Sequence, residues 1–130
     1  MMLELMFVTV SQTFHIPPGL LSAMCYTESK HDYTSYVLDD RGSPSFGECQ
    51  LKLATARQMG FKGRPSELMD PFTNIYFSGK YLGHQLKRYN GDIRKALSAY
   101  NAGTYRENSR GLTKNRKHVS KVFKNWSEDR

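Results

Sequence analysis

Residues 17–29 read P-P-G-L-L-S-A-M-C-Y-T-E-S, and the rest of the sequence is best interpreted from this stretch. Two prolines open it, which suits a first helical turn, where the backbone amides have no intrahelical acceptor. Leu21, Met24, Cys25 and Glu28 then follow at i, i+3, i+4 and i+7, which share one helix face. Desolvation at the end of such an apolar stripe disfavours a charged carboxyl group. Glu28 is therefore a candidate general acid, and a surface glutamate at the rim of an amphipathic helix is the alternative.

The length and composition indicate a globular protein. The chain has 130 residues, of which 38% are hydrophobic and 12% aromatic, so we expect a single domain over residues 1–130. No apolar run approaches the length of a transmembrane segment, and the N-terminus lacks the basic region and unbroken apolar core of a secretory signal. Apolar residues at helical spacing instead predict a short packed N-terminal helix: Leu3, Met6, Phe7, Val10 and Phe14.

The positive charge is concentrated near the C-terminus. Between residues 104 and 124 seven basic residues stand against Glu107 alone, so +6 of the formal +7 lies there. Such a patch favours an anionic partner, whether nucleic acid, an acidic membrane surface or a wall polymer, although a solvated face without a partner fits equally well. The seven are Arg106, Arg110, Lys114, Arg116, Lys117, Lys121 and Lys124.

Cys25 and Cys49 are the only two cysteines, and their spacing is too wide for a CxxC redox or zinc motif. We expect two buried free thiols, because the sequence shows no export signal that would indicate an oxidising compartment. The alternative is a disulfide, which would join the Glu28 helix to residues 47–50.

The remaining pattern predicts a mainly α protein. Residues 30–46 are polar and rich in turn formers, which predicts one long loop that contains a short strand at residues 36–38 or a short strand pair. Residues 51–59 predict a helix that Gly60 ends, and residues 61–69 an irregular connection.

Three more helices are predicted in the second half of the chain. Asp70-Pro71 marks the start of a long helix that ends near residue 90, and Gly79 and Gly83 on its apolar stripe predict close approach by another helix. The next helix begins after Asp92 and ends at Gly103. The last is amphipathic, with Val119, Val122, Phe123 and Trp126 on its apolar face.

Three ordered motifs carry a family resemblance. They are Glu28-Ser29 at a helix end, G-E-C-Q at residues 47–50 followed by L-K-L-A-T-A, and A-Y-N-A-G at residues 99–103. Together they resemble the soluble lytic transglycosylases, which have a lysozyme-like fold, with the motif-bearing core at residues 17–103. The basic loop and helix at residues 104–126 match more weakly.

The resemblance implies cleavage of the β-1,4 bond between N-acetylmuramic acid and N-acetylglucosamine in peptidoglycan. Glu28 would be the catalytic acid and then base, giving 1,6-anhydromuramic ends. Ser45, Gln50, Tyr100 and Asn101 would contact the substrate. No cofactor or metal is implied. The expected partners are glycan strands of the cell wall or periplasm and anionic envelope polymers, without nucleic acid, and the expected state is a monomer.

Two departures from the family pattern keep other functions open. Glu48 and Cys49 replace an apolar pair, and the loop after Ser29 carries Asp39-Asp40. A hydrolytic muramidase could use Asp39, Asp40 or Glu48 to position water. A non-enzymatic wall- or nucleic-acid-binding module is a weaker alternative, because Tyr105 is the one aromatic residue in the basic loop. The family arrangement also places Cys25 and Cys49 close together beneath Glu28.

Overall fold

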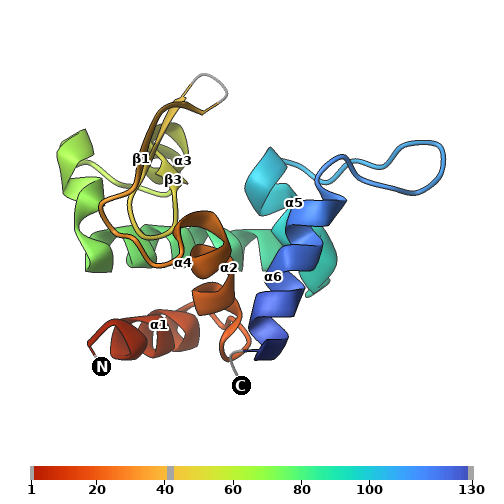
Figure 1. The fold of residues 1–130 in the computed structure, drawn as a ribbon, viewed down its shortest axis with the longest axis horizontal. Coiled ribbons are helices and arrows are strands. Elements are labelled where there is room, and N and C mark those ends of the chain that lie inside the picture. The colour runs from red at the N-terminus through yellow and green to blue at the C-terminus, as the bar shows by residue number, and fades with distance from the viewer. Residues whose placement is uncertain (1, 41–42, 129–130) are drawn as a thin grey trace.

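The structure is a computed structural model that describes residues 2–40 and 43–128, without the side chains of residues 39, 40 and 128. It is mainly α, as predicted (Figure 1). The five longest described helices are α1 (Met2–Thr13), α2 (Leu20–Ser29), α4 (Pro71–Arg88), α5 (Ile93–Ala102) and α6 (Arg116–Glu128). The remaining elements are β1 (Tyr36–Asp40), β2 (Ser43–Phe46), β3 (Leu51–Lys52), α3 (Leu53–Gln58) and the 3-10 turn η1 (Pro65–Met69).

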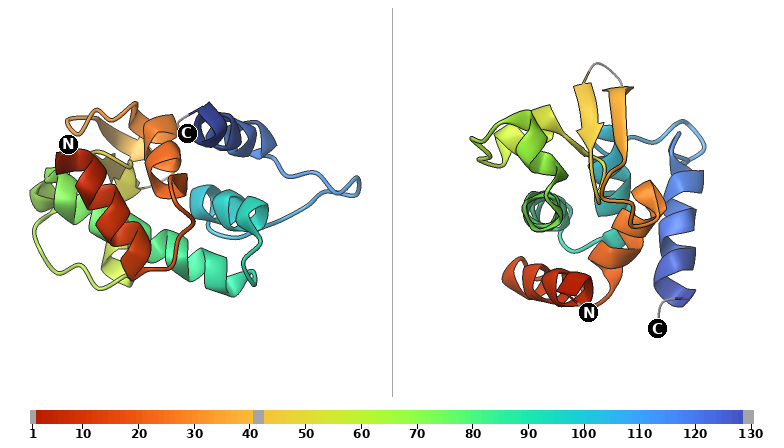
Figure 2. Two further views of the ribbon diagram at one scale, coloured as in Figure 1. Left: turned by 90° about the horizontal axis from the view of Figure 1, so that it is seen from below. Right: turned by 60° about the vertical axis from the view of Figure 1, so that its left-hand side comes forward.

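Helix α4 is the central element. Asp70 caps its N-terminus by accepting a hydrogen bond from the Thr73 amide at 2.9 Å, as the Asp-Pro signal predicts. Figure 2 (right) views α4 nearly end-on, with α1 on one side and α3 on the other. α1 crosses closely, because a Cβ at Gly79 would lie 2.3 Å from Val10 Cγ1. The predicted close approach of a helix is therefore confirmed at Gly79; at Gly83 a Cβ would lie 3.0 Å from Phe14 Cβ, in the residue after α1.

Two hydrophobic cores flank α4. The larger lies among α1, α2, α4, α5 and α6, and it includes the fully buried Leu20, Leu21, Ile75 and Leu82. The smaller lies beneath the sheet and is made of Phe46, Leu51, Ala56, Phe61 and Leu68. The cavity that carries the candidate site is lined from both parts, by residues of α2 and α5 and by residues of β3 and α3.

The sheet is antiparallel in the order β1-β2-β3, with Phe46 opposite both Tyr36 and Leu51. The predicted strand pair in the long loop is confirmed as β1 and β2. The structure extends the first strand to residue 40 and adds β3. Residues 51–52 pair with β2 before α3 begins at Leu53, two residues later than predicted. The β1 residues Y-V-L-D-D do not alternate between apolar and polar, β2 contains a proline, and β3 has two residues, so the alternation typical of strands is missing from the sequence.

Helix α2 also starts later than predicted. Pro17 and Pro18 lie in a turn closed by the Leu20 amide on the Pro17 carbonyl at 3.2 Å, and the helix begins at Leu20. Gly19, between Pro18 and the first helical residue, has φ 81°. This left-handed conformation prevents the helix from extending back to the prolines. The N-terminal helix, α4, α5 and α6 fall where the sequence predicted them.

A 13-residue stretch, 103–115, joins α5 to α6 and projects from the body of the molecule (Figure 1). Hydrogen bonds hold the start of this stretch: Arg88 donates to the Gly103 carbonyl at 3.1 Å and to Thr104 Oγ1 at 2.7 Å. In the part of the chain that the structure describes, every helix is too short or too polar to cross a membrane.

Candidate active site

Glu28 lies at the wall of a cavity of about 310 Å³. Its apolar stripe is buried as predicted, with Leu21, Met24 and Cys25 at most 1% exposed. The Glu28 side chain, at the end of that stripe, remains 17% exposed and so reaches the cavity. The other residues of the wall are Gln50, Leu51, Lys52, Thr55, Tyr81, Tyr100, Asn101, Ala102 and Gly103.

Tyr100 presents a buried phenol beside Glu28. Within residues 2–40 and 43–128, neither its hydroxyl nor that of Ser78 has a hydrogen-bond partner. Burial raises the pKa of the Tyr100 phenol well above its usual value; the neighbouring Ser78 hydroxyl opposes this effect and the Glu28 carboxyl adds to it. Burial also raises the pKa of Tyr81, whose ring centroid lies 5.1 Å from that of Tyr100. Both phenols are therefore neutral hydrogen-bond donors at physiological pH.

Gln50 enters the cavity from a tight turn at residues 47–50. Its backbone has φ 49°, which few residues other than glycine adopt, and its Nε2 donates to the Gly47 carbonyl at 3.1 Å. Asn74 of α4 holds this turn: Nδ2 donates to the Phe46 and Leu68 carbonyls, and Oδ1 accepts from the Cys49 amide. The three hydrogen bonds of the buried Asn74 side chain thus fix the turn and with it the position of Gln50.

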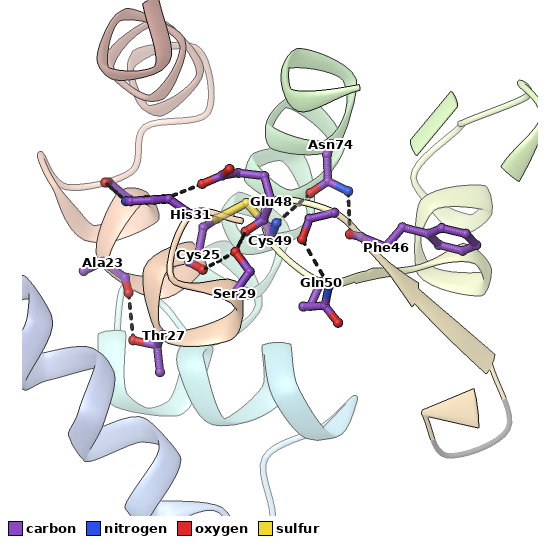
Figure 3. Close-up of a disulfide and its surroundings, with 12 residues drawn as sticks. Ala23, Cys25, Thr27, Ser29, His31, Phe46, Glu48, Cys49, Gln50 and Asn74 are labelled. Atoms are coloured by element: carbon purple, nitrogen blue, oxygen red, sulfur yellow. Dashed lines mark hydrogen bonds and ion pairs between the residues drawn. A yellow bond between two sulfur atoms is a disulfide. The ribbon is translucent and has the colours of Figure 1, made fainter. Parts of the chain in front are cut away.

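Cys25 and Cys49 form a disulfide, which corrects the expectation of free thiols (Figure 3). The expectation that they lie close together one turn below Glu28 is confirmed, since their Cα atoms are 4.1 Å apart. Ser29 adds a second link, because its hydroxyl donates to the Glu48 carbonyl at 2.5 Å. The end of α2 that carries Glu28 is thereby attached to the turn that carries Gln50.

Glu48 points away from the cavity. Its carboxylate is 1% exposed and pairs with His31 Nδ1 on the other side of the disulfide, as Figure 3 shows. Ser45 is not brought to the cavity either: it lies in β2 opposite Val37 and Lys52 and is fully buried. The Asp39 and Asp40 side chains lie outside the described residues, so the structure does not place them.

Asn101 connects the cavity to the base of α6. Asn115 Nδ2 donates to Asn101 Oδ1 at 3.0 Å and to the Ser98 carbonyl at 2.9 Å. Asn115 Oδ1 in turn accepts from the Ser98 hydroxyl at 2.8 Å. The side chain of Asn101 on α5 is therefore oriented by Asn115, the residue before α6.

The comparisons with known proteins decide the family. The family described as Transglycosylase SLT domain matches residues 6–123. The chain belongs to this family. Among the described residues of this SLT domain, no group of three or more His, Cys, Asp or Glu side chains is arranged to hold a metal ion.

Relatives of this SLT domain come from a phage and from bacteria. A transglycosylase of Enterobacteria phage PRD1 is 33% identical over 115 residues, which are 88% of this chain and 39% of that protein. Protein IpgF of Shigella flexneri is 26% identical over 95 residues, 72% of this chain and 62% of IpgF. The chain thus spans less than two thirds of the length of either relative.

A solved structure confirms the lysozyme-like fold. The lytic transglycosylase Slt of Pseudomonas aeruginosa, solved as an inactive mutant, superposes with a TM-score of 0.80 at 18% identity. The match covers 94% of this chain and 23% of that one.

The sequence interpretation missed His118. Its Nε2 lies 2.9 Å from Glu28 Oε2, which makes it a direct neighbour of the candidate acid. The sequence analysis assigned no role to His118, although it stands four positions before Val122 and so on the edge of the apolar face of α6. That spacing was the available signal.

Proposed function

We propose that this protein is a peptidoglycan lytic transglycosylase that cleaves the N-acetylmuramic acid–β-1,4–N-acetylglucosamine bond with Glu28. One observation carries the proposal. Glu28 is the single acidic side chain among the described residues that line the cavity, and it stands with Gln50, Tyr100 and Asn101 around it. The SLT family membership gives the reaction class.

The proposed reaction uses a single carboxyl group, first as an acid and then as a base. Neutral Glu28 donates its proton to the glycosidic oxygen as the bond from muramic C1 to that oxygen breaks. The carboxylate so formed then takes the proton of the muramic C6 hydroxyl, whose oxygen bonds to C1. The products are a free N-acetylglucosamine hydroxyl and a 1,6-anhydromuramic end, and Glu28 has its proton back. The nucleophile is tethered to the reacting sugar, so no second protein carboxylate has to position water.

Three neighbours would orient the glycan. The Tyr100 hydroxyl, which has no hydrogen-bond partner among the residues that the structure describes, is a neutral donor suited to the carbonyl of an N-acetyl group. The side-chain amides of Gln50 and Asn101 provide donors and acceptors for sugar hydroxyls. Ser45, buried in β2, is left out of the proposed site.

The position of Glu48 argues against a hydrolytic mechanism based on that residue. An inverting hydrolase needs a second carboxylate with access to water, about 6.5–9.5 Å from the acid. Glu48 is buried and paired with His31, so it has no such access. Asp39 and Asp40 remain candidates for that role, and the nature of the product decides between the two mechanisms.

Solubilisation of purified peptidoglycan tests the function directly. We expect the protein to release soluble muropeptides from isolated sacculi. Boiled protein is the control for non-enzymatic loss of turbidity. Failure of the native protein to release any fragment from sacculi of several bacterial sources would contradict the proposed function.

The proposed place of action is the bacterial cell wall or periplasm. The basic segment, residues 104–124, would hold the domain near anionic envelope polymers, because all seven of its Lys and Arg side chains are exposed. It would contribute attraction and no chemistry, since the described cavity wall includes none of these seven side chains.

Removing two charges from the basic segment should weaken wall binding in a salt-dependent way. We expect Lys117→Gln/Lys121→Gln to bind isolated walls more weakly at low salt and equally at about 1 M salt, where the screening length falls to about 3 Å. The measurement is a sedimentation assay with walls at both salt concentrations. Lys62→Gln/Lys87→Gln, with the same net charge but both changes outside the segment, should bind nearly as well as the wild type. Equal loss in the two variants would refute a specific role of the segment.

A further inference from the structure

The imidazole of His118 contacts the carboxyl group that the proposed reaction uses. His118 Nε2 and Glu28 Oε2 are 2.9 Å apart, and the side chains are 26% and 17% exposed. This ion-pair contact joins two partly desolvated groups, where an electrostatic contact is stronger than at an open surface. His118 is not among the residues of the cavity wall, so it contacts Glu28 from behind.

The position of His118 is determined by the packing of α6 on α2. Val119 and Val122 are buried between these helices and their neighbours. At one end of α6, Asn115 is bonded to α5, as described above; at the other, Trp126 Nε1 donates to the Pro18 carbonyl at 2.9 Å. Between them, Asn125 Nδ2 donates to Thr27 Oγ1 of α2 at 2.8 Å. The imidazole is therefore held against Glu28 by a helix that is anchored along its length.

We propose that His118 is a positioning residue for Glu28, an inference that rests on the proposed function. Its Nε2–H donates to Oε2 and fixes the plane of the carboxyl group. Oε1 is then the oxygen that exchanges the proton with the glycosidic oxygen and the C6 hydroxyl. Glu28 donates a proton in the first step and accepts one in the second, so the orientation of its carboxyl group affects both steps.

In the first step, the cleavage of the glycosidic bond, the hydrogen bond also favours the transition state over the ground state; in the second step, where the negative charge of Glu28 disappears again, it serves positioning alone. As Glu28 gives up its proton, negative charge develops on its carboxyl group. The bond from His118 then becomes charge-assisted, which roughly doubles the strength of a hydrogen bond. An interaction that strengthens as the reaction proceeds raises kcat and leaves substrate binding nearly unchanged.

Three single variants separate positioning from packing. His118→Ala removes the donor, and we expect kcat for release of soluble muropeptides to fall about 10-fold or more with KM within about 3-fold, the range for a hydrogen bond to a charged group. His118→Gln keeps a donor on a side chain of similar reach and should restore kcat to within about 3-fold of the wild type. Asn125→Ala breaks another polar contact between α6 and α2 without touching Glu28, and it should lower kcat much less than His118→Ala does, because Asn115 and Trp126 still anchor α6. Circular dichroism and thermal melting establish that each variant is folded.

The outcomes are distinguishable. A wild-type protein that releases nothing from peptidoglycan overturns the proposed function and this role together. An active wild type overturns the role of His118 alone if His118→Ala keeps its kcat, if Asn125→Ala loses as much as His118→Ala, or if the loss in His118→Ala appears in KM. Failure of His118→Gln to recover activity above His118→Ala also overturns it, because the hydrogen bond would then not be what matters.

Discussion

Glu28→Gln should abolish turnover of peptidoglycan while leaving the fold intact. Glutamine has nearly the same shape, and its amide can still accept a hydrogen bond from His118. It cannot give a proton to the glycosidic oxygen or take one from the C6 hydroxyl. General acid–base catalysis typically contributes 10²–10⁴-fold, so we expect the rate to fall by at least about 100-fold.

Release of soluble muropeptides from sacculi, measured over a range of protein concentrations, checks this prediction. The matched control is Glu4→Gln, which makes the same change at an exposed position of α1 and should keep full activity. Melting temperatures of both variants should lie close to that of the wild type. Activity of Glu28→Gln above about a tenth of wild type would refute its assignment as the acid.

Loss of the disulfide has the second-largest expected effect. The bond between Cys25 and Cys49 closes a loop with a sequence separation of 24 residues. A cross-link of that span stabilises a protein by about 3 kcal/mol in the chain-entropy account. For a chain of 130 residues this corresponds to a fall in Tm of roughly 10 °C in Cys25→Ala/Cys49→Ala.

The same variant should also lose activity below its melting transition. The disulfide attaches the Glu28 helix to the Gln50 turn, and a displacement of about 1 Å in an active site can cost about 100-fold. Ser29 and Asn74 still hold the turn, so we expect a partial loss. Reducing agent should lower the Tm of the wild type and leave that of the double variant unchanged. Titration of two free thiols in unreduced, denatured wild-type protein would contradict the disulfide.

The helices were predictable because their signals are local. Asp70 and Asp92 cap the starts of α4 and α5 with their side chains, and Gly103 ends α5. Each of these signals can be recognised from a few neighbouring residues. The Glu28 stripe is likewise a local pattern. These features placed Glu28, Tyr100 and Asn101 at helix ends before any long-range contact was known.

The features that the sequence did not reveal depend on contacts between distant segments. The pairing of β2 with β3 and the disulfide both require the 47–50 turn to fold back, and buried Asn74 holds that turn from 25 residues away. His118 meets Glu28 across 90 positions of sequence. Free thiols were expected from an argument about cellular compartment, which does not determine how close two cysteines lie in the fold. Spacing within one segment reports none of these contacts.

The central claim is tested most directly by the origin of the oxygen that bonds to C1 at the new muramic end, either water or the C6 hydroxyl. Purified peptidoglycan is digested in water labelled with heavy oxygen, and the released muropeptides are analysed by mass spectrometry. Our account predicts 1,6-anhydromuramic ends, one water lighter than reducing ends and without label, because the C6 oxygen attacks C1. Reducing muramic ends that carry one labelled oxygen would contradict it, since water would then be the nucleophile and a second carboxylate, Asp39 or Asp40, would be required.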